Sequence, residues 1–389
     1  MGAIYLDHAA TTPVRPEVLE AMLPLLGGRF GNPSSVHQFG REARAALEHA
    51  REQVAGALGA ARREIYFTSG GTEADNLAVL GRARAVARPG QQPIVAVSAI
   101  EHKAVLGAAK EASREGAELV VLAVDERGLL DLDALDQLLR AQSSTPVAVL
   151  AAMWANNEVG TLQPVGEIAD RCAAAGIAFH TDAVQAFGRV PVRVDTVGCA
   201  TLAVSGHKIG APKGIGALFV RSDTDLVALV HGGGQERAVR PGTENVAGAV
   251  ALGAAAELAV RELAVISERM QRLRNRLEHA LRAAFDDVVV NGDGAPRVPH
   301  ILNVSIPGVD QELLLVSLDL EGIAVSSGSA CQSGTVDPSH VLMAMGRVRP
   351  GDASLRFSLG ATTTEQEIDL VIHRLPQVVT RLRQLAHSA

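Results

Sequence analysis

Lysine is scarce in this chain, and one of the few lysines follows an apolar segment that is typical of a buried strand. The four lysines among the 389 residues are Lys103, Lys110, Lys208 and Lys213. Lys208 comes directly after His207, just beyond the apolar residues 201–204. Because burial lowers the pKa of a lysine, its neutral amine would be available to form a Schiff base. An exposed loop is the alternative position for Lys208, and Lys213, in a Pro-Lys-Gly turn, is the nearest competitor.

An acidic residue and a glycine-rich segment also follow apolar segments that are predicted as strands, as Lys208 does. Asp182 follows the apolar residues 177–180, where a carboxylate could pair with a protonated ring nitrogen or cap the next helix. Residues 69–75, Ser-Gly-Gly-Thr-Glu-Ala-Asp, open a helix whose first N–H groups would suit a phosphate, although the same residues also fit a helix cap. Amine, acid and phosphate anchor are three of the contacts that pyridoxal phosphate requires, and His102 could stack on its ring and move protons.

A cysteine near the C-terminal end has an unusual context. Cys331 stands in the segment Ser-Ser-Gly-Ser-Ala-Cys-Gln-Ser-Gly, residues 326–334, which predicts an exposed thiol suited to act as a nucleophile. A surface thiol without a function is the alternative. Cys172, in an Ala-rich helical stretch, and Cys199, beside an apolar segment, are typical of small buried hydrophobic residues.

Composition indicates a soluble globular protein and excludes several classes of partner. Hydrophobic residues make up 47% and charged residues 20%, and no apolar run approaches the roughly 18 residues that span a membrane. The first twelve residues have no apolar core, unlike a signal peptide. A net charge of −7 gives no reason to expect nucleic-acid binding. Three cysteines without a Cys-x-x-Cys pair predict a cytoplasmic protein, with no metal site formed by the protein alone.

Seven short apolar segments alternate with helical stretches, a pattern that predicts an α/β fold with a mainly parallel sheet between helices. The predicted strands are residues 65–68, 94–97, 119–124, 147–152, 177–180, 201–204 and 216–220. Residues 245–285 are interpreted as one long helix that leads into a smaller α+β domain. Its predicted elements are strands at 300–306, 323–325 and 355–359 and helices at 311–320 and from about 364. We expect a large domain over 14–255 and a small domain over 1–13 and 256–389.

These motifs, taken in order, make the whole chain resemble a pyridoxal-phosphate-dependent cysteine desulfurase of the NifS/IscS type. That family lies among the class V aminotransferases of fold-type I. The segments that carry the resemblance are residues 5–13 (Tyr-Leu-Asp-His-Ala-Ala-Thr-Thr-Pro), 31–35, 69–76, 101–103, 156–160, 182–185, 205–208, 231–237, 326–331 and 356–360. The resemblance implies a large, mainly parallel seven-stranded sheet between helices and a small domain that carries the cysteine loop.

The resemblance also implies a role for each matching residue. The implied catalytic residues are Cys331, which would form a persulfide, Lys208, which would form the Schiff base, and His102, which would stack on the ring. Gly71, Thr72, Ser205 and His207 would hold the cofactor phosphate, with Thr243 reaching it from another subunit; Asp182 would pair with the ring nitrogen, and Asn157 and Gln185 would contact the ring hydroxyl. Arg356 would bind the substrate carboxylate, assisted by Asn157.

The reaction implied by the resemblance converts L-cysteine to L-alanine and leaves the sulfur on Cys331. The sulfur would then pass to an iron–sulfur scaffold protein or to another acceptor, such as a partner in tRNA thiolation or DNA phosphorothioation. Cys331 could briefly hold an iron–sulfur cluster shared with such a scaffold. The family also implies a homodimer and a long, mobile loop around Cys331.

Alternatives and departures remain at this point. A lyase that prefers selenocysteine, a catalytically silent sulfur-relay paralogue and an aminotransferase are the competing functions, although an aminotransferase would not need Cys331. Residues 237–243 differ from the small residues usual in the intersubunit arm, and residues 209–211 lack an aromatic that many relatives carry. Neither departure removes a chemical group from the expected site.

Overall fold

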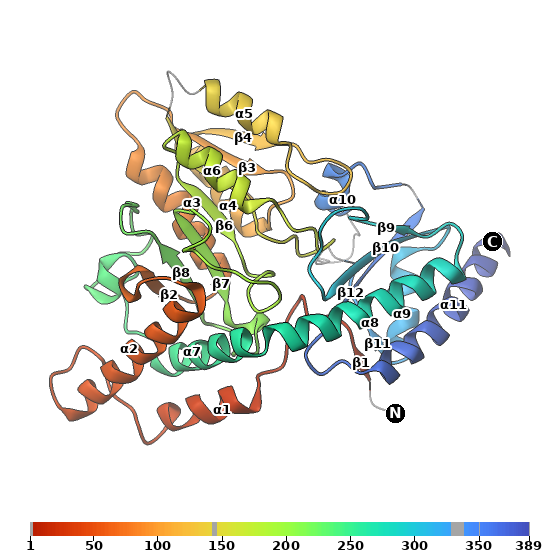
Figure 1. The fold of residues 1–389 in the computed structure, drawn as a ribbon, viewed down its shortest axis with the longest axis horizontal. Helices are drawn as coiled ribbons and strands as arrows, with labels where there is room; N and C mark the ends of the chain where they lie inside the picture. Colours follow the sequence, from red (N-terminus) through yellow and green to blue (C-terminus); the bar gives the residue numbers. More distant parts are fainter. Residues whose placement is uncertain (1–2, 142–145, 328–337, 350, 389) are drawn as a thin grey trace.

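The structure is a computed structural model that describes residues 3–141, 146–327, 338–349 and 351–388. Within these residues the strands form sheets of seven, three and two strands. Figure 1 shows the large sheet among helices on one side of the molecule and the two small sheets on the other, with α8 beside them. In the described part of the chain, none of the helices is both long and apolar enough to cross a membrane.

The large sheet confirms the predicted seven strands and their mainly parallel direction. Its order is β2-β8-β7-β6-β5-β3-β4, and β8 alone runs antiparallel to its neighbours β2 and β7. The strands are β2 (Ile65–Thr68), β3 (Ile94–Ser98), β4 (Glu118–Leu122), β5 (Val147–Ala151), β6 (Phe179–Asp182), β7 (Thr201–Ser205) and β8 (Gly216–Val220). The carboxyl ends of the parallel strands therefore meet at one edge, where ligands bind in open α/β sheets.

Helices cover both faces of this sheet, which explains why its central strands β3, β5, β6 and β7 are buried throughout. Successive side chains of a strand point to opposite faces. In β3, Val95 and Val97 pack in a cluster with α3 and α4, whereas Ile94 and Ala96 belong to the larger core that includes residues of α2, α6 and α7. The helices and 3-10 turns of this region are α1 (Pro16–Met22), η1 (Leu23–Leu26), α2 (Gln38–Leu58), η2 (Arg62–Glu64), α3 (Gly71–Val86), α4 (Lys103–Arg114), α5 (Leu132–Ala141), α6 (Val165–Ala174), η3 (Gly206–Lys208), η4 (Gln235–Ala238) and α7 (Val246–Arg261).

The C-terminal part of the chain forms a second core. The remaining elements are β1 (Ile4–Tyr5), α8 (Leu263–Ala284), β9 (Val289–Val290), β10 (Ile301–Pro307), α9 (Gln311–Leu320), β11 (Ile323–Ala324), α10 (His340–Ala344), β12 (Asp352–Ser358) and α11 (Glu365–Ser388). β10 pairs antiparallel with β12 and β9, and β1 pairs in parallel with β11. Apolar residues of α8, α9 and α11 pack on these strands in one cluster. The N-terminal segment is therefore part of the small C-terminal sheets (Figure 1).

One sequence expectation for this region is wrong. Residues 245–285 form two helices, α7 and α8, that meet at Glu262, instead of one long helix. Glu262 accepts hydrogen bonds from the guanidinium of Arg15, at 2.7 Å from Nη1 to Oε2, so the junction is tied to the N-terminal segment. Neither glycine nor proline marks this break, which is why the sequence does not reveal it.

Candidate active site

A pocket of about 490 Å³ opens at the carboxyl edge of the large sheet. Ten of the predicted site residues line it: Gly71, Thr72, His102, Asn157, Asp182, Gln185, Ser205, His207, Lys208 and Arg356. Thr243 is exposed and is not among the residues that line the pocket. Cys331 lies outside the described residues.

Lys208 is held by backbone oxygens of the N-terminal segment. Its Nζ donates hydrogen bonds to the carbonyls of Ala9, at 2.6 Å, and Ala10, at 2.7 Å. The Arg189 guanidinium donates to the backbone carbonyl of Lys208 at 3.0 Å, which fixes the turn η3. Burial, with a smaller contribution from the positive charge of Arg356, lowers the pKa of Lys208 to about 8. The amine is therefore closer to its neutral, nucleophilic form than an ordinary lysine.

Asp182 ends strand β6 and is 6% exposed. Its Oδ1 accepts a hydrogen bond from the backbone N–H of Val184 at 2.8 Å, but turns and no helix follow β6, so the helix-cap alternative is wrong. Burial raises the pKa of the Asp182 carboxyl, although the nearby His102 opposes that shift. Gln185, on the same loop, donates from Nε2 to the Ala9 carbonyl at 2.9 Å. Asp182 thus lacks a full countercharge, and a cationic ring nitrogen would supply one.

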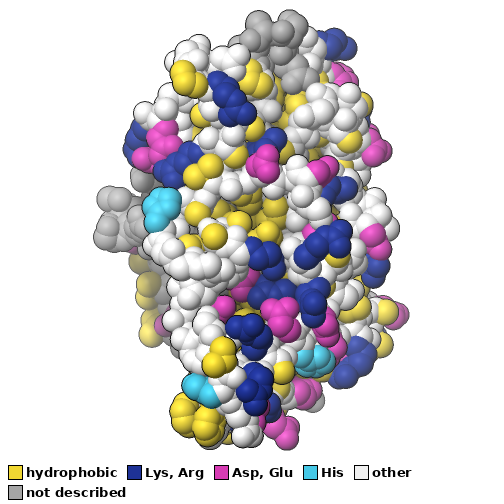
Figure 2. Space-filling view, turned by 90° about the vertical axis from the view of Figure 1, so that its left-hand side faces the viewer, with side chains coloured by type: hydrophobic (Ala, Val, Ile, Leu, Met, Phe, Trp, Pro, Cys, Tyr) yellow, Lys and Arg dark blue, Asp and Glu magenta, His cyan; other side chains and the backbone are white. Residues whose placement is uncertain are grey.

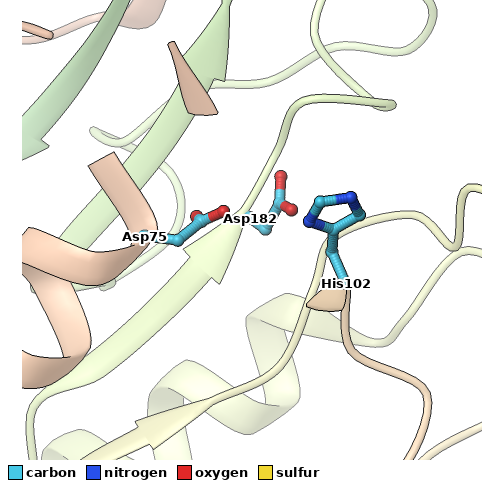
Figure 3. A group of neighbouring side chains, drawn as sticks. All are labelled: Asp75, His102 and Asp182. Carbon is cyan, nitrogen blue, oxygen red and sulfur yellow. The ribbon is translucent and has the colours of Figure 1, made fainter. Parts of the chain in front are cut away.

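His102 faces Asp182 from the other side of the pocket. Figure 3 shows Asp75, Asp182 and His102 with their polar ends turned toward one another. One carboxylate oxygen of each aspartate and one ring nitrogen of His102 lie within 4.8 Å of one another. His102 precedes α4, and its Nδ1 accepts a hydrogen bond from the backbone N–H of Ala104 at 3.2 Å. In the neutral ring this bond leaves the proton on Nε2. The preceding Glu101 is fully buried, and burial raises its pKa to about 8.

The start of α3 forms the end of the pocket that suits a phosphate. Gly70 has a φ of 157°, which favours glycine, and it caps α3 without a side-chain hydrogen bond. A Cβ added to Gly71 would come within 2.9 Å of the Val184 side chain, so only glycine leaves this cradle open. Ser205 ends β7 nearby, and the Nδ1 of His207 lies 3.2 Å from the Thr11 hydroxyl. The first backbone N–H groups of a helix have no partner within the helix and attract anions.

Arg356 contributes the cation at the opposite end. It stands on β12 and is 4% exposed. Its Nη2 donates to Asp7 Oδ1 at 2.7 Å, and its Nη1 donates to the Asn157 carbonyl at 2.9 Å. The Arg356 Nε is buried without a hydrogen-bond partner. A guanidinium in this position can take a substrate carboxylate alongside, or in place of, Asp7.

Both flanks of the segment that contains Cys331 line the same pocket. Ser326, at the start of this segment, exchanges backbone hydrogen bonds with Arg356, at 2.7 Å from Arg356 N to Ser326 O. After it, the Ser339 hydroxyl donates to Glu158 Oε2 at 2.5 Å, and His340 lies against the pocket. The His340 Nε2 lies 3.0 Å from the Glu101 carbonyl, which can only accept. These contacts fix the two points between which the segment runs.

Sequence reasoning missed four residues that line this pocket. Asp7, Asp75, Glu158 and His340 all contribute to its walls. Asp7 stood in a recognised motif without a role, and Asp75 was considered only as part of a helix cap. That capping alternative is wrong, because the Asp75 carboxylate is buried toward His180, at 3.3 Å from Oδ1 to Nε2, and does not cap α3. Glu158 stood after a predicted strand, in the recognised segment 156–160, without a role, and for His340 no signal in the sequence marked a place in the pocket.

The residues present fit pyridoxal phosphate. One pocket holds three groups that suit this cofactor. They are the Lys208 amine with its lowered pKa, the buried Asp182 carboxyl without a full countercharge, and the start of α3 that a Cβ on Gly71 would block. The volume of about 490 Å³ is within the range of cofactor and ligand pockets. The chemistry of the donor set therefore matches an aldehyde, a ring nitrogen and a phosphate.

Comparisons with known proteins agree with this pocket. The family model described as Aminotransferase class-V matches residues 4–371. The chain is 44% identical over 384 residues to a protein named cysteine desulfurase IscS from Dictyoglomus turgidum, with 98% of this chain and 96% of that protein covered. A solved structure titled NifS-like protein superposes with a TM-score of 0.89 at 34% identity, covering 98% and 100% of the two chains. Another, titled SspA in complex with cysteine, gives 0.79 at 32% identity, covering 93% and 100%.

Proposed function

This chain belongs to the class V aminotransferase family, as one of its cysteine desulfurases, and we propose that its pocket converts L-cysteine to L-alanine and passes the sulfur to Cys331. One observation carries the proposal. The pocket brings together Lys208, Asp182 and Arg356, and both flanks of the segment that contains Cys331 line it. A place for the cofactor, a cation for the substrate and a path for a thiol thus meet in one site.

The cofactor of this family is pyridoxal phosphate, which supplies an electron sink for bonds at the substrate α-carbon when it is bound. Lys208 would hold it covalently and Asp182 would pair with its ring nitrogen. His102 would lie against its ring, and Asn157 and Gln185 would contact the ring hydroxyl side. The residues assigned to its phosphate are Gly71, Thr72, Ser205 and His207, with Thr243 from a second subunit.

The substrate would be oriented by its carboxylate. Arg356 is a buried guanidinium that already holds one carboxylate, that of Asp7, at 2.7 Å. The carboxylate of L-cysteine carries the same charge and geometry, so it can share the guanidinium with Asp7, and Asn157 assists from the adjacent backbone. A solved structure similar over 93% of this chain is titled SspA in complex with cysteine, and it supports cysteine as the substrate proposed here.

Two side chains would move protons. Lys208 takes the proton from the substrate α-carbon, and its pKa of about 8 leaves a useful fraction of neutral amine near neutral pH. His102, with its Nε2 free of the helix contact, gives and takes protons at the substrate sulfur and the product carbon. Neither role requires a group from outside the pocket.

Sulfur transfer would then proceed at Cys331. The Cys331 thiolate attacks the substrate sulfur, so that an S–S bond forms and the C–S bond breaks. The bond electrons stay on the carbon, which takes a proton to become the methyl group of L-alanine. Cys331 is five residues beyond Ser326, and five residues of extended chain span about 17 Å. The chain from Ser326 to Cys331 is therefore long enough for the thiol to reach the pocket.

The quaternary structure we propose is a homodimer. Side chains at the start of the chain are hydrophobic and exposed, among them Leu26 at 64% and Phe30 at 65%. Phe30 stacks on Phe39 with ring centroids 5.3 Å apart. Figure 2 shows hydrophobic side chains at the surface on the side where α2 lies, including a group at the lower edge. Such patches mark protein interfaces. Thr243 is exposed and outside the pocket of its own subunit, so it is placed to contact the pocket of a second subunit. A sedimentation mass of one chain would contradict this proposal.

We also propose two domains and a cytoplasmic place of action. The separate clusters of buried hydrophobic residues support a large domain over 14–255 and a small one over 1–13 and 256–389, although Ala9, Leu258, Val298 and Ile301 pack with the larger cluster. The sulfur acceptor would be an iron–sulfur scaffold or another thiolated partner, and Cys331 could briefly share a cluster with a scaffold. Cys172 and Cys199 are free thiols, which suits a reducing compartment.

The proposed activity is tested with the purified protein, pyridoxal phosphate and L-cysteine. We expect L-alanine to be released without any added 2-oxo acid, and the peptide that contains Cys331 to gain the mass of one sulfur atom. A requirement for a 2-oxo acid would instead identify an aminotransferase. Comparison of alanine release from L-cysteine and L-selenocysteine decides between the two substrates, and absence of alanine from both contradicts the proposed function.

A further inference from the structure

A second buried acid lies behind Asp182, and the proposed chemistry does not use it. Asp75 stands on α3 and is 1% exposed. Figure 3 shows its carboxylate pointing toward Asp182, with His102 on the far side. One carboxylate oxygen of each aspartate and one ring nitrogen of His102 lie within 4.8 Å of one another. Two carboxylates this close in a buried site repel each other when both are ionised.

A third carboxyl, Glu101, increases this conflict. It is fully buried, its Oε1 accepts from the Met153 N–H at 2.8 Å, and its Oε2 has no hydrogen-bond partner. The negative charge of Asp182 raises the pKa of both Asp75 and Glu101, in addition to the larger effect of burial. The titratable groups around Asp75 are therefore His180 and Asp182 from β6 and Glu101 and His102 from the loop between β3 and α4. The three carboxyls, Asp75, Glu101 and Asp182, cannot all be ionised at the same time.

His180 shows where a proton resides. It stands two residues before Asp182 on β6, and its side chain is fully buried. Its Nδ1 lies 2.9 Å from the Thr201 hydroxyl, and its Nε2 lies 3.3 Å from Asp75 Oδ1. Burial lowers the pKa of His180 to about 3 and raises that of Asp75 well above its usual range. A proton on Asp75 satisfies both directions, because Asp75 then donates to Nε2 of the neutral imidazole while Nδ1 faces the Thr201 hydroxyl.

We propose that Asp75 is a positioning residue of this site: a neutral acid, hydrogen-bonded to His180, that stands behind Asp182 and leaves it as the ionised carboxylate facing the cofactor nitrogen. The proposal deepens the proposed function, because it rests on the role of Asp182 there. It gives a reason for an acid where an apolar residue would fill the space equally well. A neutral acid there holds His180 by its one O–H and adds no competing negative charge behind Asp182.

The test compares Asp75→Asn with Asp75→Leu, and uses Asp170→Asn, on the exposed face of α6, as the matched control. The infrared carbonyl band of protonated carboxyls is recorded at pH 7, and Glu101→Gln identifies the part that belongs to Glu101. We expect Asp75→Asn to remove a separate part of this band, and the control to remove none. The band is also read in the cofactor-free protein, so it reports on Asp75 even if no cofactor binds.

A second measurement follows the cofactor itself by absorbance. Because Asn replaces one neutral group by another, the midpoint pH of the spectral transition should stay within about 0.3 of wild type in Asp75→Asn. Asp75→Leu removes the hydrogen bond to His180 and should weaken cofactor binding about tenfold. An unchanged infrared band, or a midpoint that falls by about one unit in Asp75→Asn as the loss of a negative charge requires, overturns the proposal.

Discussion

Arg356 and Asp7 form an ion pair inside the active-site pocket, with 2.7 Å between Nη2 and Oδ1. The two residues are 349 positions apart in the chain, and they meet because the N-terminal segment lies along β12. The Arg356 side chain is 5% exposed and that of Asp7 is 22% exposed. The guanidinium proposed for the substrate carboxylate is thus oriented before any substrate arrives, by a carboxylate that also competes for it.

The first prediction concerns this pair. Arg356→Lys keeps the charge but loses the planar fork that holds Asp7 and the Asn157 carbonyl. We expect the KM for L-cysteine to rise by about 10- to 100-fold, the effect of losing one or two charge-assisted hydrogen bonds. Steady-state kinetics of alanine release measure this change, and the cofactor spectrum should stay as in wild type.

Asp7→Asn provides the complementary variant. Removing the competing negative charge should lower the KM by about threefold, while kcat falls because the guanidinium is less well oriented. A KM that is unchanged in both variants would show that Arg356 does not bind the substrate carboxylate.

The second prediction concerns the pH at which the cofactor attaches to Lys208. Only the neutral amine attacks an aldehyde, and the pKa of Lys208 in the cofactor-free protein is lowered to about 8, chiefly by burial. The rate of attachment should rise about tenfold per pH unit below pH 8 and level off above it, as the fraction of neutral amine does. Stopped-flow absorbance after mixing with pyridoxal phosphate measures the rate between pH 6 and pH 10.

Lys213→Ala is the control, since Lys213 is not among the residues that line the pocket. Its profile should match wild type, whereas Lys208→Ala should give no covalent absorbance at any pH. The lowered pKa of Lys208 also makes the stability of the fold depend on pH. The folded state binds fewer protons than the unfolded state between about pH 8 and pH 10.5, so the Lys208 contribution stabilises the cofactor-free fold as pH rises through that window. A midpoint near 10.5 in the kinetic profile would contradict a buried lysine.

Much of the large sheet could be predicted because its strands, apart from the edge strand β4, are largely buried. The predicted bounds of β2 and β8 match the structure at both ends, and the other strands differ by a few residues. Continuous apolar segments between polar turns carry that signal. The site residues at the strand ends follow from the same pattern, because parallel strands must end at one edge. Lys208 and Asp182 are close in space for this reason alone.

The remaining features depend on contacts between distant parts of the chain. Strands β1 and β9 have two residues each, which is too short for an alternating pattern to show. Asp7 forms its ion pair with Arg356, at the opposite end of the sequence. Asp75 on α3 lies near Asp182 at the end of β6, although the two are far apart in the sequence. A single sequence shows which side chains are polar, but it cannot show which of two polar side chains becomes a partner after folding.

The third prediction separates Cys331 from the two other cysteines. Cys172 and Cys199 are fully buried, and burial raises the pKa of each thiol to about 12, so neither offers a thiolate near neutral pH. Cys331→Ala should keep the cofactor spectrum and reduce alanine release at least about a thousandfold, as expected for loss of a nucleophile. Alanine release and alkylation by iodoacetamide measure the two effects.

Cys172→Ala and Cys199→Ala serve as matched controls, because each removes one sulfur from the hydrophobic core. Both variants should keep alanine release near wild type and the fast alkylation of one thiol, with some loss of stability. Normal turnover in Cys331→Ala would assign the sulfur transfer to another group.

The fourth prediction concerns a buried ion pair beside the arm that carries Thr243. Arg51 on α2 and Glu236 in η4 are 3% and 6% exposed, and two hydrogen bonds of 2.7 Å join them. Glu236 also accepts from the Phe67 N–H at 3.1 Å. Residues 236–238 all have a positive φ, between 43° and 64°, although none is glycine. This unfavourable backbone persists because the buried pair holds it in place.

Breaking this pair should therefore cost more than one hydrogen bond. Glu236→Ala leaves the Arg51 cation buried without its partner, and we expect the free energy of unfolding to fall by about 3 to 5 kcal/mol. The double variant Arg51→Met, Glu236→Ala removes both charges, and it should recover much of that loss because no buried charge remains unpaired. Chemical denaturation of the four proteins in the double-mutant cycle measures the coupling. If the double variant is as unstable as Glu236→Ala, the cost lies in the strained backbone at residues 236–238 and not in the unpaired charge.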